Sequence, residues 1–373
     1  MSACATCGAS LGDAAAFCEA CGNPVGAAPR ATVPAPAGAS DLPAEAAPFD
    51  DLGSGPISSP TRAAGTVPAE PAERRPCLSC GGEVGPDGYC EQCGTKQPSE
   101  RDHFRETPAA WVAGVCDRGI THTRNEDAMA LAASEAPGER AVLVVLDGVS
   151  SSVDSDVASL AGARAARDAL RTPFPQALGT PQSRASAVAA TFTAAVKAAN
   201  DAIVATTAAD STNPASATFS VAVIEGTRLS VANIGDSRVY WFPDGGDAVQ
   251  LTVDDSVAQV QMAGGMTRAE AENGPQGHAI TRWLGQDAPD LVPTVVEIDL
   301  AGSGWVMNCS DGMWNYASEP QALADQIAAA GTSDPLELAL ALTAYANACG
   351  GRDNITVALA RHNAPITERE TDG

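Results

Sequence analysis

Apolar and polar positions change their pattern near residue 108 of the chain. Beyond that point, short apolar runs alternate with longer segments of helical period. We predict strands over 141–146, 218–224, 228–233, 238–242, 294–299, 304–308 and 355–361. We predict helices over 157–170, 185–206, 256–263, 267–273, 321–330 and 335–348. Hairpins, such as the one turning at Glu225-Gly226, favour stacked sheets covered by helices over a parallel doubly wound sheet.

The residues before 108 carry little periodic apolar pattern. Residues 1–24 and 77–97 are two short units rich in cysteine, and 25–76 is a stretch of Ala, Pro, Gly and Ser. That composition buries too little apolar surface to offset chain entropy, so we expect a disordered linker. We place the main domain at 108–363 and a flexible tail at 364–373.

Composition narrows the classes of partner. The chain has 373 residues, 45% of them hydrophobic, and a formal net charge of -24. So acidic a chain is a poor ligand for nucleic acid or an anionic membrane. No apolar run approaches the roughly 20 residues of a membrane span, and the N-terminus lacks a signal-peptide pattern. We expect a cytoplasmic protein.

Eight of the 11 cysteines form CxxC pairs, each followed by glycine. Two such pairs supply the four thiolates of a closed tetrahedral zinc site, and glycine permits the sharp turn behind each pair. Repetition at similar spacing favours zinc over redox pairs or disulfides. We predict two structural zinc ions, in units that resemble double-zinc-ribbon elements and serve to bind a protein partner. The ligands are Cys4, Cys7, Cys18 and Cys21 in the first unit and Cys77, Cys80, Cys90 and Cys93 in the second.

Acidic residues stand at the ends of apolar strands in the main domain. Asp147 and Asp311 each follow such a run, Asp353 precedes one, and Glu126-Asp127 form a further acidic pair. A carboxylate in that position is costly unless it is paired or bound to a metal. Hard oxygen ligands suit Mg²⁺ or Mn²⁺, and two such ions roughly 3.5–4 Å apart activate water and clamp a phosphoryl group.

The order of these motifs resembles the metal-dependent protein phosphatases of type 2C. The resemblance runs from about residue 111 to 361. Its motifs are Asp117-Arg118-Gly119 to Asp127, Asp147-Gly148, Ala217-Thr218 with Ala232–Arg238, Leu251–Ser256, Cys309–Trp314 and Gly351–Val357.

The resemblance implies an α+β fold, an αββα four-layer sandwich of two antiparallel sheets flanked by helices. It implies phosphoserine and phosphothreonine hydrolysis by a metal-activated water. Asp147 would bridge two Mg²⁺ or Mn²⁺ ions, helped by the Gly148 carbonyl. Asp311 and Asp353 would complete one metal shell, and Glu126 and Asp127 would hold the waters of the other. Asp236, with Asp311, would bind a third metal.

The chain departs from the family pattern where phosphate is held. His122 stands where the family usually has arginine. Either His122 donates to phosphate, or Arg124 reaches round from a shifted backbone, or metal holds the phosphate. With Asp147 these are the candidate catalytic residues. Val149 replaces a frequent histidine, and the serines that follow it, 150–152, would supply donors or cap the next helix.

The leading functional hypothesis is a protein Ser/Thr phosphatase acting on phosphorylated proteins, such as a Ser/Thr kinase or its targets. One alternative is a catalytically weak or inactive scaffold that binds phosphoproteins, or partners through its zinc ribbons. Another is a stress-signalling phosphatase for an anti-sigma-factor antagonist, which Asp236, the motif at Asp353 and the segment 251–287 disfavour.

Overall fold

The structure is a computed structural model that describes residues 76–77, 80–85, 88–95, 97, 99–175 and 179–364, together with the backbone of 2–3 and 10–11. The two N-terminal dipeptides form an antiparallel pair, β1 (Ser2–Ala3) with β2 (Ser10–Leu11). The four cysteines of the first predicted zinc unit lie outside the described residues. So do the predicted linker before residue 76 and the tail beyond 364.

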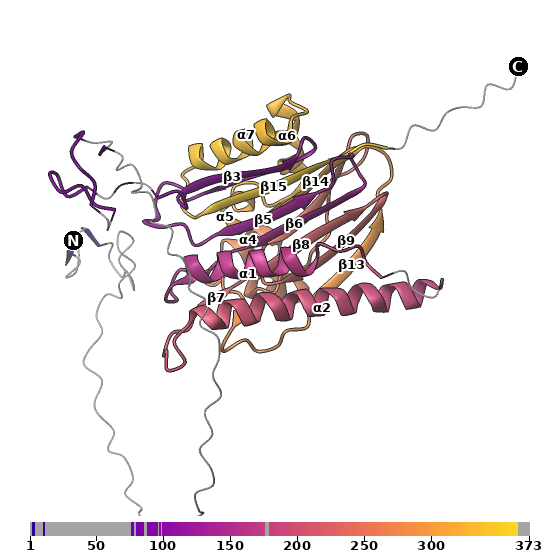
Figure 1. Ribbon diagram of the computed structural model, residues 1–373, viewed down its shortest axis with the longest axis horizontal. Helices are drawn as coiled ribbons and strands as arrows, with labels where there is room; N and C mark the ends of the chain where they lie inside the picture. The colour runs from indigo at the N-terminus through magenta and orange to yellow at the C-terminus, as the bar shows by residue number, and fades with distance from the viewer. Residues whose placement is uncertain are drawn as a thin grey trace, which may run out of the picture. The chain divides into compact units, whose positions relative to one another are not determined.

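Two antiparallel sheets form the centre of the main domain (Figure 1). The six-stranded sheet has the order β11 (Val249–Gln250), β10 (Arg238–Pro243), β14 (Gly304–Cys309), β15 (Ile355–His362), β4 (Val112–Asp117) and β3 (His103–Ala109). The five-stranded sheet has the order β13 (Thr294–Asp299), β9 (Arg228–Ile234), β8 (Phe219–Glu225), β6 (Arg140–Leu146) and β5 (Ala128–Ala133).

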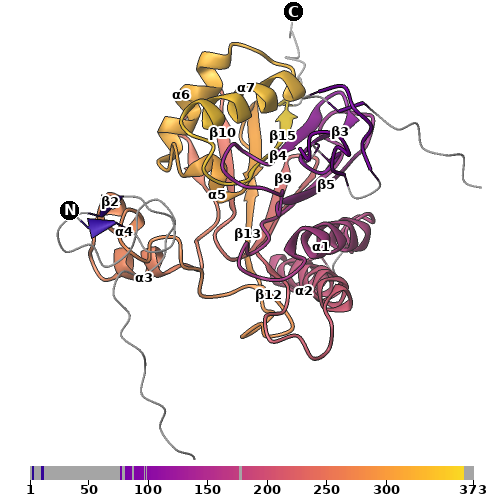
Figure 2. The same cartoon turned by 90° about the vertical axis from the view of Figure 1, so that its left-hand side faces the viewer.

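Helices cover the outer face of each sheet, as Figure 2 shows. The helices α1 (Ser155–Ala169) and α2 (Pro181–Thr206) pack on the five-stranded sheet. The helices α5 (Asp311–Trp314), α6 (Pro320–Ala330) and α7 (Pro335–Ala348) pack on the six-stranded sheet. A third apolar core lies between the sheets. The predicted α+β, αββα four-layer sandwich is therefore confirmed.

Strand β6 shows why its sequence is an unbroken apolar run. Val142 and Val144 face α1 and α2, whereas Leu143 and Val145 face the other sheet. Successive side chains of a strand point to opposite faces, so a strand between two cores is apolar at every position.

Several elements escaped the prediction, among them β3, β4, β5 and α5. Strand β3 lies largely before residue 108, where we predicted no strand. It is an edge strand with alternating exposed side chains, so its sequence lacks an apolar run. Strand β5 has the sequence Ala-Met-Ala-Leu-Ala-Ala, and alanine does not favour strands. Helix α5 is a single turn, too short for helical periodicity to appear.

Helix α2 is long and apolar enough, by length and composition alone, to cross a membrane. Its sequence is not an unbroken apolar run, because polar and charged residues such as Lys197 and Asp201 interrupt it. Its buried residues include Val188, Phe192 and Ile203, and they join the core beneath α1. Core helices of soluble proteins meet the same criterion, so the feature is weak evidence for a membrane span.

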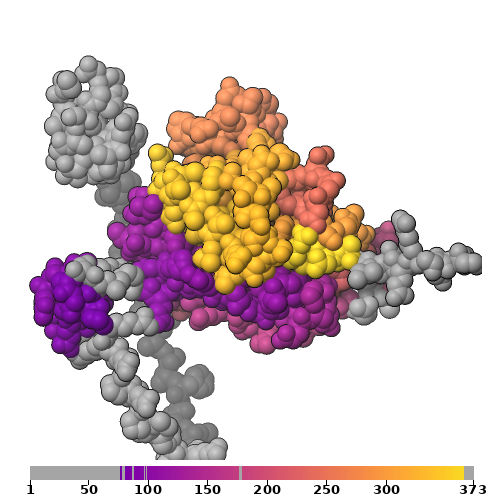
Figure 3. Space-filling model, turned by 90° about the horizontal axis from the view of Figure 1, so that it is seen from above, coloured from indigo at the N-terminus to yellow at the C-terminus, as the bar shows by residue number. Residues whose placement is uncertain are grey.

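The segment between β11 and β13 carries two short helices, α3 (Val257–Ala263) and α4 (Arg268–Glu272), in orange beside the gold α6–α7 layer in Figure 3. Ser256 caps α3 by accepting from the Gln259 N–H at 3.2 Å. Thr267 and Glu270 form a capping box at α4. The predicted helices over 256–263 and 267–273 are confirmed.

Candidate metal centre

The three predicted aspartates come from strands of both sheets. Asp147 directly follows β6, Asp311 opens α5 after β14, and Asp353 lies two residues before β15. Residue 148 also bridges to residue 217 in the short strand β7 (Ser216–Ala217). The structure thus gathers these carboxylates at one end of the sandwich, as the sequence predicts.

Buried carboxylates interact strongly at this end. Burial, together with the charges of Asp127, Asp311, Asp353 and Asp236, raises the pKa of Asp147 well above its ordinary value. Burial and the charge of Asp353 raise the pKa of Asp311 to about 7. Such a group of like charges is stable only with bound protons or a bound cation.

Three buried carboxylate oxygens among the described residues have no hydrogen-bond partner: Glu126 Oε2, Asp127 Oδ1 and Asp311 Oδ1. The other Asp127 oxygen accepts from Ser310 Oγ at 2.6 Å and Thr356 Oγ1 at 2.7 Å, which fixes the carboxylate. Unpartnered buried oxygens are costly, and a hard divalent cation satisfies them. The residues present therefore fit a Mg²⁺ or Mn²⁺ centre.

His122 and Arg124 both lie against Glu126. The Arg124 Nε donates to Glu126 Oε1 at 2.6 Å, and His122 Nδ1 is 3.6 Å from Oε2. The other His122 nitrogen is 3.3 Å from Asp353 Oδ1. Burial of Glu126 opposes its ionisation, but His122 and Arg124 outweigh it and lower the pKa of Glu126.

The segment that carries Arg124 is not a strand. Residues 122–127 are irregular, and strand β5 begins only at Ala128. Arg124 Nη2 also donates to the Ser152 carbonyl at 3.2 Å and to Ser155 Oγ at 3.3 Å. Arg124 thus contacts Glu126, the loop at Ser152 and the start of α1, and which group holds phosphate stays a prediction.

Asn354 organises residues 122–127, here called the acidic loop, a role that the sequence interpretation missed. Its Oδ1 accepts from the Glu126 N–H at 2.7 Å. Its Nδ2 donates to the carbonyls of Arg118 at 2.8 Å and Arg124 at 3.1 Å. A buried amide beside a predicted metal ligand was the available signal, since the motif Asp353-Asn354 is visible in the sequence.

Two glycines permit close backbone approaches at the site. A Cβ atom at Gly148 would stand 2.7 Å from the Glu126 carbonyl oxygen. At Gly312 it would stand 1.9 Å from the Asn354 carbonyl oxygen. The structure gives both positions a steric reason for glycine, beside the metal-binding role predicted for Gly148.

The serines after Val149 do not cap α1, so that alternative is wrong. The N-cap is Asp154, which adopts a left-handed conformation with φ of 52°. Ser152 Oγ instead donates to the Val149 carbonyl at 2.6 Å and stabilises the loop.

Asp236 lies beside a buried ion-pair network centred on Arg238. Burial and the charge of Asp311 raise the pKa of Asp236 well above its ordinary value. The side chain of Arg238, only 1% exposed, donates to Asp254 Oδ2 at 2.6 Å and Glu272 Oε1 at 2.8 Å. The guanidinium stacks 3.5 Å from the ring centroid of Trp314, whose Nε1 donates to the Asp236 carbonyl at 2.9 Å. The network joins α4 to the site.

A cleft of about 700 Å³ opens beside Asp311 and Asp353. Residues of helices α4 and α5, and those that follow α5, line this cleft. Arg268 in this cleft is paired with Glu272 at 3.1 Å and Glu319 at 3.4 Å. Arg352 is exposed in the same cleft.

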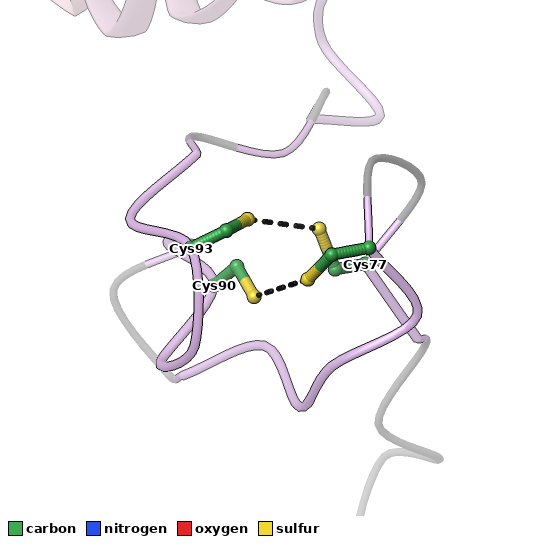
Figure 4. A group of neighbouring side chains, drawn as sticks. Cys77, Cys90 and Cys93 are labelled. Atoms are coloured by element: carbon green, nitrogen blue, oxygen red, sulfur yellow. Dashed lines mark hydrogen bonds between the residues drawn. The ribbon is translucent and has the colours of Figure 1, made fainter.

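The second cysteine unit forms a separate candidate metal site. The sulfurs of Cys77, Cys80, Cys90 and Cys93 all lie within 4.8 Å of one another, with pairs at 3.7 and 3.4 Å (Figure 4). Thiolates at ~2.3 Å from a zinc ion stand about 3.8 Å apart, so the spacing fits zinc. Gly81 and Gly94 have φ of 74° and 70° and make the turns predicted behind each pair.

The chain is similar in sequence to known protein phosphatases. A family model described as protein phosphatase 2C matches residues 119–327. Protein phosphatase PhpP of Streptococcus pneumoniae is 36% identical over 154 residues, which are 40% of this chain and 60% of the relative. The chain thus spans less than two thirds of that relative's length. Serine/threonine phosphatase stp of Listeria innocua is 28% identical over 250 residues, or 66% of this chain and 94% of the relative.

Solved structures agree with the fold. The serine/threonine phosphatase PstP/Ppp of Mycobacterium tuberculosis has a TM-score of 0.54 and 27% identity, covering 68% of this chain and 98% of that chain. The catalytic domain of PstP in complex with 2 manganese ions has a TM-score of 0.52 and 26% identity, with the same coverage of both chains.

Proposed function

The chain belongs to the protein phosphatase 2C family, and on that premise we propose that it hydrolyses phosphoserine and phosphothreonine in phosphorylated proteins at a Mg²⁺ or Mn²⁺ centre. The observation that carries this proposal is the group of three buried, unpartnered carboxylate oxygens on Glu126, Asp127 and Asp311. The phosphatases that the chain resembles are named for serine and threonine. This supports phosphoproteins as substrates, a Ser/Thr kinase or its targets among them.

Asp147, Asp311 and Asp353 would hold the ions, with Glu126, Asp127 and Asp236 as further acidic residues of the site. Bound divalent ions supply a Lewis acid that activates water and a positive clamp for phosphoryl oxygens. The protein itself contributes a fixed, buried set of oxygens, because Ser310 and Thr356 orient Asp127 and Asn315 donates to Asp311 Oδ2 at 3.1 Å.

We propose that Arg124, rather than His122, faces the phosphate. The Nε and Nη2 of Arg124 are held by Glu126, Ser152 and Ser155, and its side chain remains 36% exposed. That arrangement orients the guanidinium and leaves Nη1 for a phosphoryl oxygen. His122 lies between Glu126 and Asp353, with its two nitrogens 3.6 Å and 3.3 Å from their carboxylate oxygens.

The second cysteine unit is proposed to bind one structural zinc ion. Beyond the sulfur spacing, the Gln92 N–H donates to Cys90 Sγ at 3.4 Å and the Gln97 side chain donates to Cys77 Sγ at 3.2 Å. Donors to sulfur favour the thiolate form that zinc requires. We also propose a reducing, cytoplasmic location, where such thiols persist.

The test is hydrolysis of p-nitrophenyl phosphate and a phosphothreonine peptide by the purified chain with Mn²⁺. Asp311→Asn should lower kcat/KM for both by about 100-fold or more, since it removes a direct metal ligand. Asp325→Asn, an exposed change on α6, is the matched control and should leave both rates unchanged. Absence of turnover by the Mn²⁺-loaded wild type would favour the scaffold alternative.

A further inference from the structure

Residues 99–102 connect the second cysteine unit to the main domain and are fixed to it. The Ser99 N–H donates to Asp102 Oδ2 at 2.9 Å, and the Arg118 N–H donates to the Asp102 carbonyl at 2.7 Å. Asp102 is buried, with 9% of its surface exposed. These residues precede the family match, which begins at residue 119.

Arg101 in this segment reaches the backbone of the acidic loop. Its Nη2 donates to the carbonyls of Asp156 at 2.7 Å, Asp127 at 3.0 Å and Asn125 at 3.3 Å. In return, Asn125 Nδ2 donates to the Arg101 carbonyl at 2.9 Å. The guanidinium lies 5.4 Å from the ring centroid of Phe104.

The carbonyls that Arg101 binds belong to the segment that carries Glu126 and Asp127. That segment is irregular and has no sheet partner to hold it before β5 begins. Asn354 holds its other side through the Glu126 N–H. Arg101 therefore supplies a further support, beside Ser159 Oγ, which donates to the Glu126 carbonyl at 2.5 Å, and it also joins the loop to the first turn of α1 through Asp156.

We infer that Arg101 is a positioning residue for the metal centre, acting through the backbone of Asn125 and Asp127 to place the Glu126 and Asp127 carboxylates. It does not touch substrate. The inference rests on the proposed function, in that Glu126 and Asp127 lie in the shell of a Mg²⁺ or Mn²⁺ ion. Partners outside the ligand shell typically contribute 10–100-fold to metal affinity.

The experiment measures Mn²⁺ binding to the full, zinc-loaded chain by calorimetry and by the electron paramagnetic resonance signal of free Mn²⁺. Arg101→Ala should weaken Mn²⁺ binding by about 10-fold or more. KM for p-nitrophenyl phosphate at saturating Mn²⁺ should stay unchanged, because Arg101 does not contact substrate. Arg101→Lys should restore part of the affinity, since an ammonium group donates to carbonyls without the planar fork.

Arg105→Ala is the matched control, since Arg105 is exposed on β3 and no hydrogen bond or ion pair of its side chain is found within the described residues. Arg101→Ala with wild-type Mn²⁺ affinity, whatever its melting temperature, overturns the inference. If Arg101→Ala does not fold, Arg101→Lys decides, and wild-type affinity in that variant overturns it. Wild-type chain that binds Mn²⁺ without phosphatase activity would instead contradict the proposed function alone.

Discussion

At the residue scale, Asp127, Asp147 and Asp311 lie close together, and none of them forms an ion pair with a basic side chain among the described residues. Burial raises the pKa of Asp127 and of Asp311 to about 7, with added repulsion from Asp353. Near neutral pH these aspartates would therefore release a proton when they hold a divalent metal ion. Proton and metal compete for the same oxygens, so the stability of the metal-free chain depends on pH.

The metal-free chain should lose stability as pH rises from about 4 to about 7. A carboxyl whose folded pKa lies above its unfolded value stabilises the fold while protonated. That stability is complete below the unfolded pKa, near 4, and disappears as pH passes the folded pKa of about 7. Calorimetric melting without Mn²⁺ should show this decline. Added Mn²⁺ should raise the melting temperature more at pH 8 than below the folded pKa of about 7, where protons occupy the same oxygens. A melting temperature that increases with pH in the metal-free chain would contradict the pKa assignment.

Arg352 should give the enzyme a preference for acidic residues beside the phosphorylated one. It is exposed in the cleft next to Asp353, and its guanidinium has no ion pair with any described residue. Arg352→Ala should raise KM several-fold for a phosphopeptide with flanking glutamates. It should change neither p-nitrophenyl phosphate hydrolysis nor a peptide with flanking alanines. An equal loss on all three substrates would instead indicate a role at the phosphate.

Sequence reasoning identifies the residues of the site better than their supports. A carboxylate at a strand end, as at Asp147 and Asp311, is visible because it interrupts an apolar run. The supports of the acidic loop are not visible in this way. Arg101 acts on backbone carbonyls, which leave no pattern in the sequence. Asn354 stands in a visible motif, but its partner Glu126 lies 228 residues away along the chain.

At the scale of elements, α5 depends on the close approach of Gly312 to Asn354. Gly312→Ala should destabilise the chain by roughly 1–3 kcal/mol or more, since a Cβ atom there would overlap backbone. It should also reduce activity, because Asp311 is the first residue of the same helix. Urea unfolding measures the first effect. Gly245→Ala, where a Cβ atom meets nothing within 4 Å, should be nearly neutral.

The link between α4 and the sheet is predicted to depend on Arg238. Replacing it with methionine leaves Asp254 and Glu272 without their buried counter-charge, a loss of about 3–5 kcal/mol. Lys197→Met removes a pair whose side chains are 70% and 62% exposed, and should cost less than about 1 kcal/mol. Similar unfolding free energies for the two variants would show that the Arg238 network adds little to stability.

Element prediction succeeded where one pattern dominated. Helix α7, with proline after Asp334 and a regular apolar face, matches its predicted range. Strand β5 failed because its alanines suit a helix, and only pairing with β6 places it in the sheet. Such pairing is a tertiary effect that local propensity does not carry.

At the scale of the whole molecule, a large sandwich with its own apolar cores follows a small cysteine unit for which we propose a zinc ion. The sandwich was predictable because hairpins and long helices in this order leave few layer arrangements. The second cysteine unit has no comparable core, so zinc is expected to supply its folding energy.

Cys77→Ser should remove one zinc ion per chain and leave phosphatase activity intact. Elemental analysis should find about two zinc ions in the wild type if both four-thiolate units bind one each. The matched control is Cys349→Ser, an exposed cysteine outside both units, which should keep the wild-type zinc content. Loss of activity in Cys77→Ser alone would show that the unit supports catalysis as well as its own fold.

The hydrogen bonds of Arg101 also bear on where this enzyme can be cut or grafted. The family match begins at residue 119, and a boundary drawn there discards Arg101 with all of β3 and β4, whereas one at the predicted position 108 discards Arg101 with most of β3. A catalytic fragment that starts at residue 99 retains both. In fusion proteins and in natural domain shuffling, the portable module is thus longer than the family match, and its extra residues support the end of the sandwich that carries the candidate metal centre.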